Sequence, residues 1–339
     1  MGPSRQEKFE LQKAAAIQNG SKFVRVSLAQ SQVTGELHYK LDGEEASKQL
    51  VVFIHGIGGG MLHFREQMTA LASSGYRVLG LDFFGRGLSL PPTKTGNMCS
   101  NLSLYDAHMH IEQIHCLLHE LQLLDFPDIT LCGFSMGGAI CMRFLDEYAL
   151  PNIKKVVLFS PAGMLDPMPI ISCFRCCCLA CVCSCGINCL TSCLGSISTP
   201  QEEDDRKAFH VMDTPVADEM VRCTAEYAEV NDLQTAVFKS AAKVTELVQS
   251  SVIVSRVLKE QRKIQFLFIW AQEDQYVPVV PSMDRYQTLC ARERGDGEDC
   301  GYRFEVLEKC GHCSMLEATE RVNDLLFAFL NEKNNEIEE

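Results

Sequence analysis

The sequence has no run of more than two consecutive basic residues, and its 31 Lys and Arg against 44 Asp and Glu give a formal net charge of −13. Proteins bind phosphate backbones with positively charged stripes, so this lack argues against a nucleic-acid partner. The composition, 46% hydrophobic and 22% charged, excludes a disordered or collagen-like chain and a polytopic membrane protein. For 339 residues we expect one large domain, or one domain with an insertion.

The first residues also lack the apolar stretch of a secretory signal. Met1-Gly-Pro-Ser-Arg-Gln-Glu-Lys8 is polar, whereas a signal peptide needs an apolar core of about 7–15 residues. We therefore expect a cytoplasmic protein, in which the 18 cysteines are thiols rather than disulfides because that compartment is reducing.

After a polar leader, apolar runs alternate with segments of helical spacing. Two stretches in which apolar and polar residues alternate, Lys22–Leu28 and Gly35–Leu41, predict an antiparallel pair at a sheet edge. Continuous apolar runs predict buried strands at Leu50–His55, Arg77–Phe83, Ile129–Phe134, Lys155–Ser160, Ile264–Trp270 and Arg303–Glu308. Helices are expected at Phe64–Ser74, about Leu104–Leu124, Gly137–Tyr148, near Ser282–Arg292 and from Leu316. This order predicts an α/β fold, with a mostly parallel sheet covered on both faces by helices.

The alternation stops between residues 164 and 262, where no buried-strand pattern occurs. This stretch contains a cysteine-rich segment at residues 173–193 and continues as helical, charged sequence from Pro200 to Lys259. We expect residues 1–163 and 263–339 to form the two parts of one core, and residues 164–262 to form a helical cap or lid inserted into it.

Ser135 is the first candidate for chemistry. It lies in Gly133-Phe-Ser-Met-Gly137, directly after a predicted strand and before a predicted helix. In this context G-x-S-x-G forms a strained strand-to-helix turn that exposes a nucleophilic hydroxyl. A serine needs a neutral imidazole to take its proton, and the imidazole needs a carboxylate to fix its tautomer. Asp274 and His312, which follow the last two predicted strands, complete the predicted catalytic set.

A glycine-rich stretch, His55-Gly-Ile-Gly-Gly-Gly60, follows the first buried strand. Glycines let the backbone approach a bound group closely. We expect the backbone N–H groups of Ile57 and Met136 to form an oxyanion hole. No Lys-Ser/Thr pair follows the glycines and no G-x-G-x-x-G motif is present in this stretch, so neither a P-loop nor a dinucleotide site is predicted. No metal and no cofactor are expected.

These motifs, with Asp82-Phe-Phe-Gly-Arg-Gly-Leu-Ser89, resemble those of the α/β-hydrolase superfamily over residues 50–160 and 264–330. The layout is similar to serine esterases and monoglyceride-lipase-like enzymes, in which a lid is inserted after the strand that follows the nucleophile helix. The resemblance implies an eight-stranded, mostly parallel sheet, and it assigns the same catalytic and oxyanion residues.

The sequence departs from the superfamily pattern just before the acid. Gln272 stands where the family often has glycine, which makes Glu273 a rival for Asp274. Because position 135 is serine and not aspartate, epoxide hydrolase and haloalkane dehalogenase activities are disfavoured, since both need a carboxylate nucleophile.

We expect hydrolysis of carboxylic esters through an acyl-enzyme, and the apolar lid favours lipid-like substrates such as monoacylglycerols. An acyl-protein or acyl-CoA thioesterase and a C–C bond hydrolase use the same three residues and stay open as alternatives. From another class, a catalytically idle hydrolase fold could serve as a membrane-tethered scaffold.

The cysteine-rich segment allows three interpretations. From Pro169 to Leu194 the only charged side chain is Arg175, yet a single membrane crossing would separate Ser135 from the other two catalytic residues. The first interpretation is reversible S-acylation, which would hold the protein peripherally on a membrane. The second is a metal cluster, for which the C-x₂-C pairs lack a partner pair at a finger-like distance, and the third is an apolar loop with thiols as fillers. The S-acylation candidates are Cys176, Cys177, Cys178, Cys181, Cys183 and Cys185, and the C-x₂-C pairs are Cys173/Cys176 and Cys178/Cys181.

Overall fold

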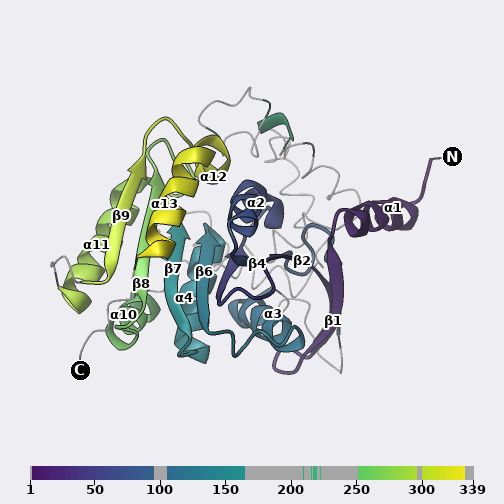
Figure 1. The fold of residues 1–339 in the computed structure, drawn as a ribbon, viewed down its shortest axis with the longest axis horizontal. Coiled ribbons are helices and arrows are strands. Elements are labelled where there is room, and N and C mark those ends of the chain that lie inside the picture. Colours follow the sequence, from purple (N-terminus) through teal and green to yellow (C-terminus); the bar gives the residue numbers. More distant parts are fainter. Residues whose placement is uncertain are drawn as a thin grey trace, which may run out of the picture.

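The computed structural model describes residues 2–94, 105–164, 251–295 and 300–332, together with residues 209, 215, 217–219 and 222. Its central sheet has the strand order β1-β2-β4-β3-β6-β7-β8-β9 (Figure 1). The strands are β1 (Lys22–Leu28), β2 (Val33–Gly43), β3 (Gln49–Ile54), β4 (Arg77–Leu81), β6 (Asp128–Phe134), β7 (Ile153–Phe159), β8 (Gln265–Ala271) and β9 (Tyr302–Leu307). A two-residue strand, β5 (Thr93–Lys94), pairs with β2.

The predicted fold class is confirmed. The six strands from β4 to β9 along the sheet are parallel to their neighbours. Strand β2 is antiparallel to both β1 and β4, and β1 and β2 form the antiparallel edge pair that the alternating patterns predicted. Within the described ranges, the short β5 is the one strand outside this mostly parallel, eight-stranded path.

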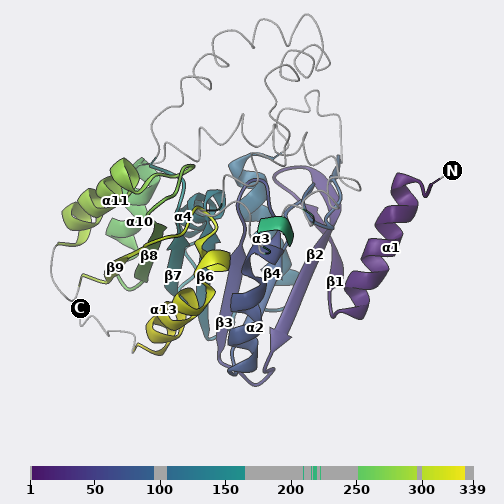
Figure 2. The same cartoon turned by 90° about the horizontal axis from the view of Figure 1, so that it is seen from above.

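Helices cover both faces of the sheet (Figures 1 and 2). One face carries α3 (Ala107–Glu120), α4 (Met136–Tyr148), α10 (Ser251–Glu260) and α11 (Val279–Arg294), and the other carries the 3₁₀ helix η1 (Met61–Phe64), α2 (Arg65–Ser73), α12 (Ser314–Glu317) and α13 (Thr319–Asn331). On β3, Leu50 and Val52 belong to the first core cluster, and Val51 and Phe53 to the second. Since successive side chains of a strand point to opposite faces, a strand between two helix layers must be apolar at every position.

The sequence patterning predicted no element before residue 22, but the structure contains α1 (Arg5–Gln18). Ser4 and Glu7 form a capping box, in which Ser4 Oγ accepts from the Glu7 N–H and the Ser4 N–H donates to Glu7 Oε2. Phe9 is the one fully buried residue of α1, and it packs with Leu88 beside the β1 edge of the sheet (Figure 1). The S-x-x-E spacing of the capping box was the available signal for this helix.

Helix α10 lies within residues 164–262, the predicted cap, but it packs on α4 and α11. Its Val254, Val257 and Leu258 belong to the larger core cluster. The division into core and cap stays a prediction, and the cysteine-rich segment lies outside the described residues. Among the residues that are described, no helix combines the length and the apolar character that a membrane crossing requires.

Candidate active site

The three predicted catalytic residues follow strands that end at one edge of the sheet. Ser135 follows β6, Asp274 follows β8 and His312 follows β9. Since these strands are parallel, their carboxyl ends lie along the same edge, where open α/β sheets bind ligands.

Ser135 adopts a strained backbone conformation, with φ 54° and ψ −117°, at the junction of β6 and α4. A non-glycine residue in such a region costs on the order of 1–3 kcal/mol. The turn is held because the Ser135 N–H donates to Phe159 O (2.9 Å) and the Gly138 N–H donates to Ser135 O (3.0 Å). A Cβ on Gly137 would lie 2.1 Å from Ile54 O, which explains the glycine there. This turn presents a partly exposed serine directly at the end of a central strand.

Asp274 and His312 are in direct contact, with 2.7 Å between Asp274 Oδ2 and His312 Nδ1. The other carboxylate oxygen, Oδ1, accepts the N–H groups of Tyr276 (2.9 Å) and Val277 (2.8 Å). The Asp274 side chain is 0% exposed. A buried carboxylate held in this way fixes the tautomer of the imidazole, so that Nε2 is the ring nitrogen that can accept a proton.

Glu273, the rival acid, contacts the backbone that precedes His312. Its Oε2 accepts the Cys310 N–H (3.1 Å), and Glu317 Oε2 accepts the Gly311 N–H (2.6 Å). These two carboxylates therefore hold the loop, whereas Asp274 holds the imidazole.

His312 lies against the turn that contains Ser135. The ring of Phe134, the residue before Ser135, is 4.6 Å from the His312 ring between centroids. Among the described residues, no hydrogen bond joins Ser135 Oγ to His312. In free enzymes this contact is often long and shortens when substrate binds. The contact between Asp274 and His312 is therefore present in the structure, whereas a hydrogen bond between Ser135 Oγ and His312 is not.

The glycine-rich loop runs directly past the serine, because a Cβ on Gly56 would lie 3.3 Å from Ser135 Cβ. Neither the Ile57 N–H nor the Met136 N–H donates to an acceptor in the part of the chain that the structure describes. Met136 is the first residue of α4, where an N–H has no partner within its own helix. Two N–H groups without an acceptor beside a nucleophile can bind an oxyanion.

The segment Asp82–Ser89 holds this loop in place, a role that the sequence analysis did not assign. Asp82 Oδ1 accepts the Met61 N–H (2.7 Å), and Oδ2 lies 2.6 Å from His38 Nδ1. Burial alone would raise the pKa of Asp82, but the interactions with His38 lower it below its ordinary value. A Cβ on Gly87 would lie 1.9 Å from Asp82 Oδ2, so the second glycine of the motif makes room for the carboxylate.

Two histidines behind the loop are fully buried. His55 Nδ1 donates to Gly56 O (2.7 Å), and its Nε2 accepts the Phe83 N–H (3.0 Å). Burial lowers the pKa of His55 to about 4 and that of His110 to about 3. Both imidazoles are therefore neutral at pH 7, and His55 is a structural support that its motif position alone did not reveal.

These two histidines predict that acid destabilises the protein. In the unfolded chain each takes up a proton near pH 6.5, but in the folded chain only near pH 4 or 3. The unfolded state binds more protons between these values, so the free energy of unfolding falls as the pH drops below 6.5. We expect a loss of about 4 kcal/mol between pH 7.5 and 5.0 from the pair, measured by urea unfolding. His110→Gln should lose about 2 kcal/mol less than the unsubstituted protein over this pH range, and equal stability of the unsubstituted protein at both pH values would contradict the prediction.

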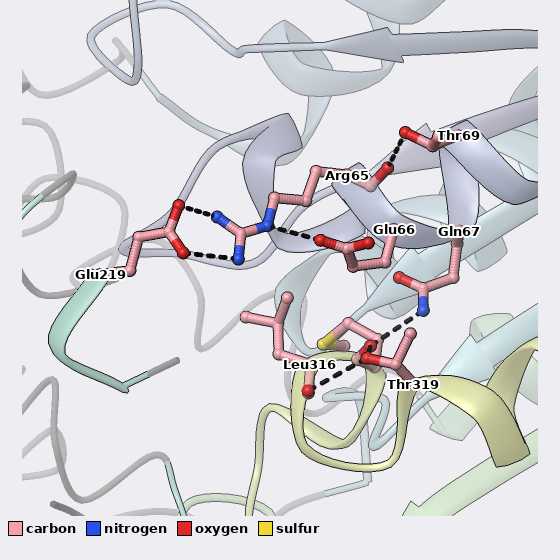
Figure 3. Close-up of polar contacts among 8 residues, drawn as sticks. Arg65, Glu66, Gln67, Thr69, Glu219, Leu316 and Thr319 are labelled. Atoms are coloured by element: carbon pink, nitrogen blue, oxygen red, sulfur yellow. Dashed lines mark hydrogen bonds and ion pairs between the residues drawn. The ribbon is translucent and has the colours of Figure 1, made fainter. Parts of the chain in front are cut away.

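Glu219, a described residue of the predicted cap, contacts Arg65 at the start of α2 (Figure 3). Both carboxylate oxygens of Glu219 pair with Arg65, one of them 2.8 Å from Nη2. The two side chains are 41% and 26% exposed, so the pair contributes at most about 1 kcal/mol. Phe209 and Ala217, in contrast, are buried in the same core cluster as Phe64. Apolar packing therefore attaches this part of the cap more strongly than the ion pair does.

The cysteines that the structure describes are free thiols. Burial raises the pKa of Cys310 to about 12 and that of Cys141 further, so neither is a reactive thiolate. Within the described ranges, no three His, Cys, Asp or Glu side chains are arranged to hold a metal ion. The S-acylation candidates and the C-x₂-C pairs lie outside the described residues.

Comparison with known proteins supports the same fold. Residues 49–175 match the family model described as alpha/beta hydrolase fold. The AB hydrolase superfamily protein YisY of Bacillus subtilis (strain 168) is 30% identical over 113 residues, which are 33% of this chain and 38% of that protein. Four curated relatives with 30–32% identity are matched over 36–41% of their own lengths. The chain therefore spans about two fifths of these relatives.

Two longer matches cover nearly the whole chain. The 2-hydroxy-6-oxononadienedioate/2-hydroxy-6-oxononatrienedioate hydrolase of Paraburkholderia phymatum is 25% identical over 323 residues, which are 92% of this chain and 96% of that protein. The structure of a thermophilic esterase from Thermogutta terrifontis superposes with a TM-score of 0.64, at 18% identity, over 91% of this chain and 98% of that one. At this identity the structural likeness shows the fold alone.

Proposed function

Because this chain has the α/β-hydrolase fold, we propose that it is a serine hydrolase that cleaves carboxylic esters through an acyl-enzyme. One observation carries the proposal. The buried Asp274 lies 2.7 Å from the His312 imidazole, and that imidazole packs beside the strained turn of Ser135. A chain without hydrolytic function has no need to keep a strained serine, an oriented imidazole and a buried carboxylate at one edge of its sheet.

In the first half of the reaction, Ser135 Oγ attacks the carbonyl carbon of the ester while His312 Nε2 takes its proton. The carbonyl oxygen becomes an oxyanion, which the N–H groups of Ile57 and Met136 bind. Such a donor is worth roughly 3–4 kcal/mol. Asp274 stabilises the imidazolium that forms and does not itself become protonated.

In the second half, His312 gives its proton to the leaving alcohol, and the acyl group stays on Ser135. A water molecule then attacks the acyl-enzyme while His312 takes the proton of the water. His312 returns this proton to Ser135 Oγ as the bond between the acyl group and the serine breaks and the acid leaves. The same residues therefore act twice, with no cofactor required in either half.

For the substrate we propose a lipid-like acyl ester, because the predicted cap contains a long segment with almost no charge. Similarity to a C–C bond hydrolase over 92% of this chain favours C–C cleavage as the second candidate. A thioesterase shares the same three residues. A catalytically idle, membrane-tethered scaffold is the alternative outside the enzymes.

The proposal is tested with the purified full chain, a fluorophosphonate probe and three substrate classes. The substrates are p-nitrophenyl esters of increasing acyl length, an acyl-CoA and a vinylogous 1,5-diketone acid. We expect covalent labelling together with turnover of the esters. Turnover of the diketone acid alone would select the C–C hydrolase, and a folded protein that neither labels nor turns over any substrate would select the scaffold.

The S-acylation of Cys176, Cys177, Cys178, Cys181, Cys183 and Cys185 stays a prediction from the sequence, as does peripheral attachment to a membrane. Two or more acyl chains give stable attachment, whereas one chain is marginal. We expect hydroxylamine-sensitive incorporation of a fatty-acyl probe, and loss of the probe and of membrane sedimentation when all six residues are changed to serine. Unchanged labelling of the six-serine variant would reject the prediction.

A further inference from the structure

Arg86 lies in the Asp82–Ser89 segment and has no part in the reaction as described so far. Its side chain is fully buried. The Nε group donates to Ile57 O (3.0 Å), and Nη1 donates to Phe84 O (3.2 Å). The guanidinium therefore links the loop after β4 to the loop after β3, at the residue whose N–H is proposed to bind the oxyanion.

The two peptide planes that flank Ile57 are each held by a buried side chain. His55 Nδ1 donates to Gly56 O, and because the C=O and N–H of a trans peptide point in opposite directions, this bond also sets the direction of the Ile57 N–H. Arg86 holds the next plane through Ile57 O. Both dihedral angles of Ile57 are thereby constrained.

Without Arg86, only the peptide plane before Ile57 would be held by a side chain. Three glycines, Gly58 to Gly60, follow Ile57, and glycine has more accessible backbone conformations than any other residue. The next anchor along the chain is the bond from the Met61 N–H to Asp82. The Arg86 guanidinium therefore holds the Ile57 end of the loop, where the N–H is needed, and Asp82 holds the Met61 end.

Arg86 also brings charge next to Ile57, since its Nε lies 3.0 Å from Ile57 O. Burial lowers the pKa of Arg86 to about 10, which leaves it cationic at neutral pH. The Arg86 charge also helps to lower the pKa values of His55 and His110, although burial is the larger cause. A fixed cation in a buried environment stabilises nearby negative charge more than it would in water.

We propose that Arg86 is a positioning residue for the oxyanion hole: it holds the peptide plane that follows Ile57, so that the Ile57 N–H, whose direction His55 sets, stays aimed at the developing oxyanion, and it places a fixed positive charge next to Ile57. The inference rests on the proposed function, since it concerns the tetrahedral intermediate of that reaction. Arg86 does not touch the substrate, so its loss should affect the transition state more than substrate binding.

The test compares Arg86→Gln and Arg86→Lys with the unsubstituted full chain on a p-nitrophenyl ester. We expect Arg86→Gln to lower kcat by about 100-fold with KM changed less than about 3-fold, as when an oxyanion donor is lost. A trifluoromethyl ketone, which mimics the tetrahedral intermediate, should bind more weakly by a similar factor. Arg86→Lys keeps the charge but lacks the planar fork, and we expect it to retain an intermediate kcat, about 10-fold below that of the unsubstituted chain.

Arg294 on α11 supplies the matched control. It is a partly buried arginine that also donates to backbone carbonyls, those of Leu258, Gln261, Ile264 and Gly301, and none of these residues belongs to the site. Arg294→Gln should lower the melting temperature and leave kcat unchanged. This control separates a general loss of packing from a loss of the oxyanion hole.

The outcomes are distinct. If Arg86→Gln keeps kcat within 3-fold, as Arg294→Gln is expected to do, the inference is overturned while the proposed function stands. If Arg86→Gln does not fold, Arg86→Lys decides, and an unchanged kcat in that variant overturns the inference. An unsubstituted chain that turns over no ester overturns the proposed function and this inference together.

Discussion

Ser135→Ala is expected to lower kcat for ester hydrolysis by about 10⁴- to 10⁶-fold and to abolish fluorophosphonate labelling. The substitution removes the hydroxyl oxygen that is proposed to form the acyl-enzyme, and the proposed mechanism gives this role to no other residue of the site. The proposed oxyanion donors and the substrate-binding surface remain, which is why turnover roughly 10³- to 10⁴-fold above the uncatalysed rate is still expected. Stability should change little, because alanine keeps the Cβ of serine in the same strained backbone conformation.

Ser160 offers a matched control for this substitution. It directly follows β7, the strand beside β6, and it also has a positive φ of 38°. Its hydroxyl oxygen is buried and has no hydrogen-bond partner among the described residues. Ser160→Ala should keep full labelling and kcat. Substantial turnover by a folded Ser135→Ala protein would remove the nucleophile from the proposed mechanism.

Asp274→Asn is expected to lower kcat by about 10⁴-fold. An asparagine can place its amide NH₂ toward His312 Nδ1, which stabilises the wrong tautomer of the imidazole and leaves Nε2 protonated and unable to act as a base. The imidazolium of the transition state also loses the negative charge beside it. The test is to measure kcat and KM across pH 5–9. We expect KM to change much less than kcat, because the proposed mechanism gives Asp274 no contact with the substrate.

Glu273→Gln is the control that distinguishes the two neighbouring acids. Glutamine keeps an oxygen that can accept the Cys310 N–H, so the loop before His312 should stay in place and kcat should fall less than about 10-fold. A larger loss in Glu273→Gln than in Asp274→Asn would reverse the assignment and make Glu273 the acid.

Much of the architecture could be predicted from short stretches of the sequence. The buried strands could be predicted because a strand between two helix layers has no polar face, and the runs in β3 and β8 are apolar throughout. The turn at Ser135 could be predicted because its glycines, its strand and its helix are contiguous in the chain. Helix α1 was missed because its apolar residues form no wide stripe, so only its capping box signals it.

The chain by itself determined which side chains stand at the carboxyl edge of the sheet, since each follows a strand whose direction the alternation of elements sets. Only the tertiary structure decided how those side chains pair. The contact between Asp274 and His312 joins residues 38 positions apart, and the bond from Arg86 to Ile57 joins residues 29 apart. Such pairings depend on how separate loops meet above the sheet, and adjacent residues with the same chemistry, such as Glu273 and Asp274, differ there only in the direction in which each side chain points.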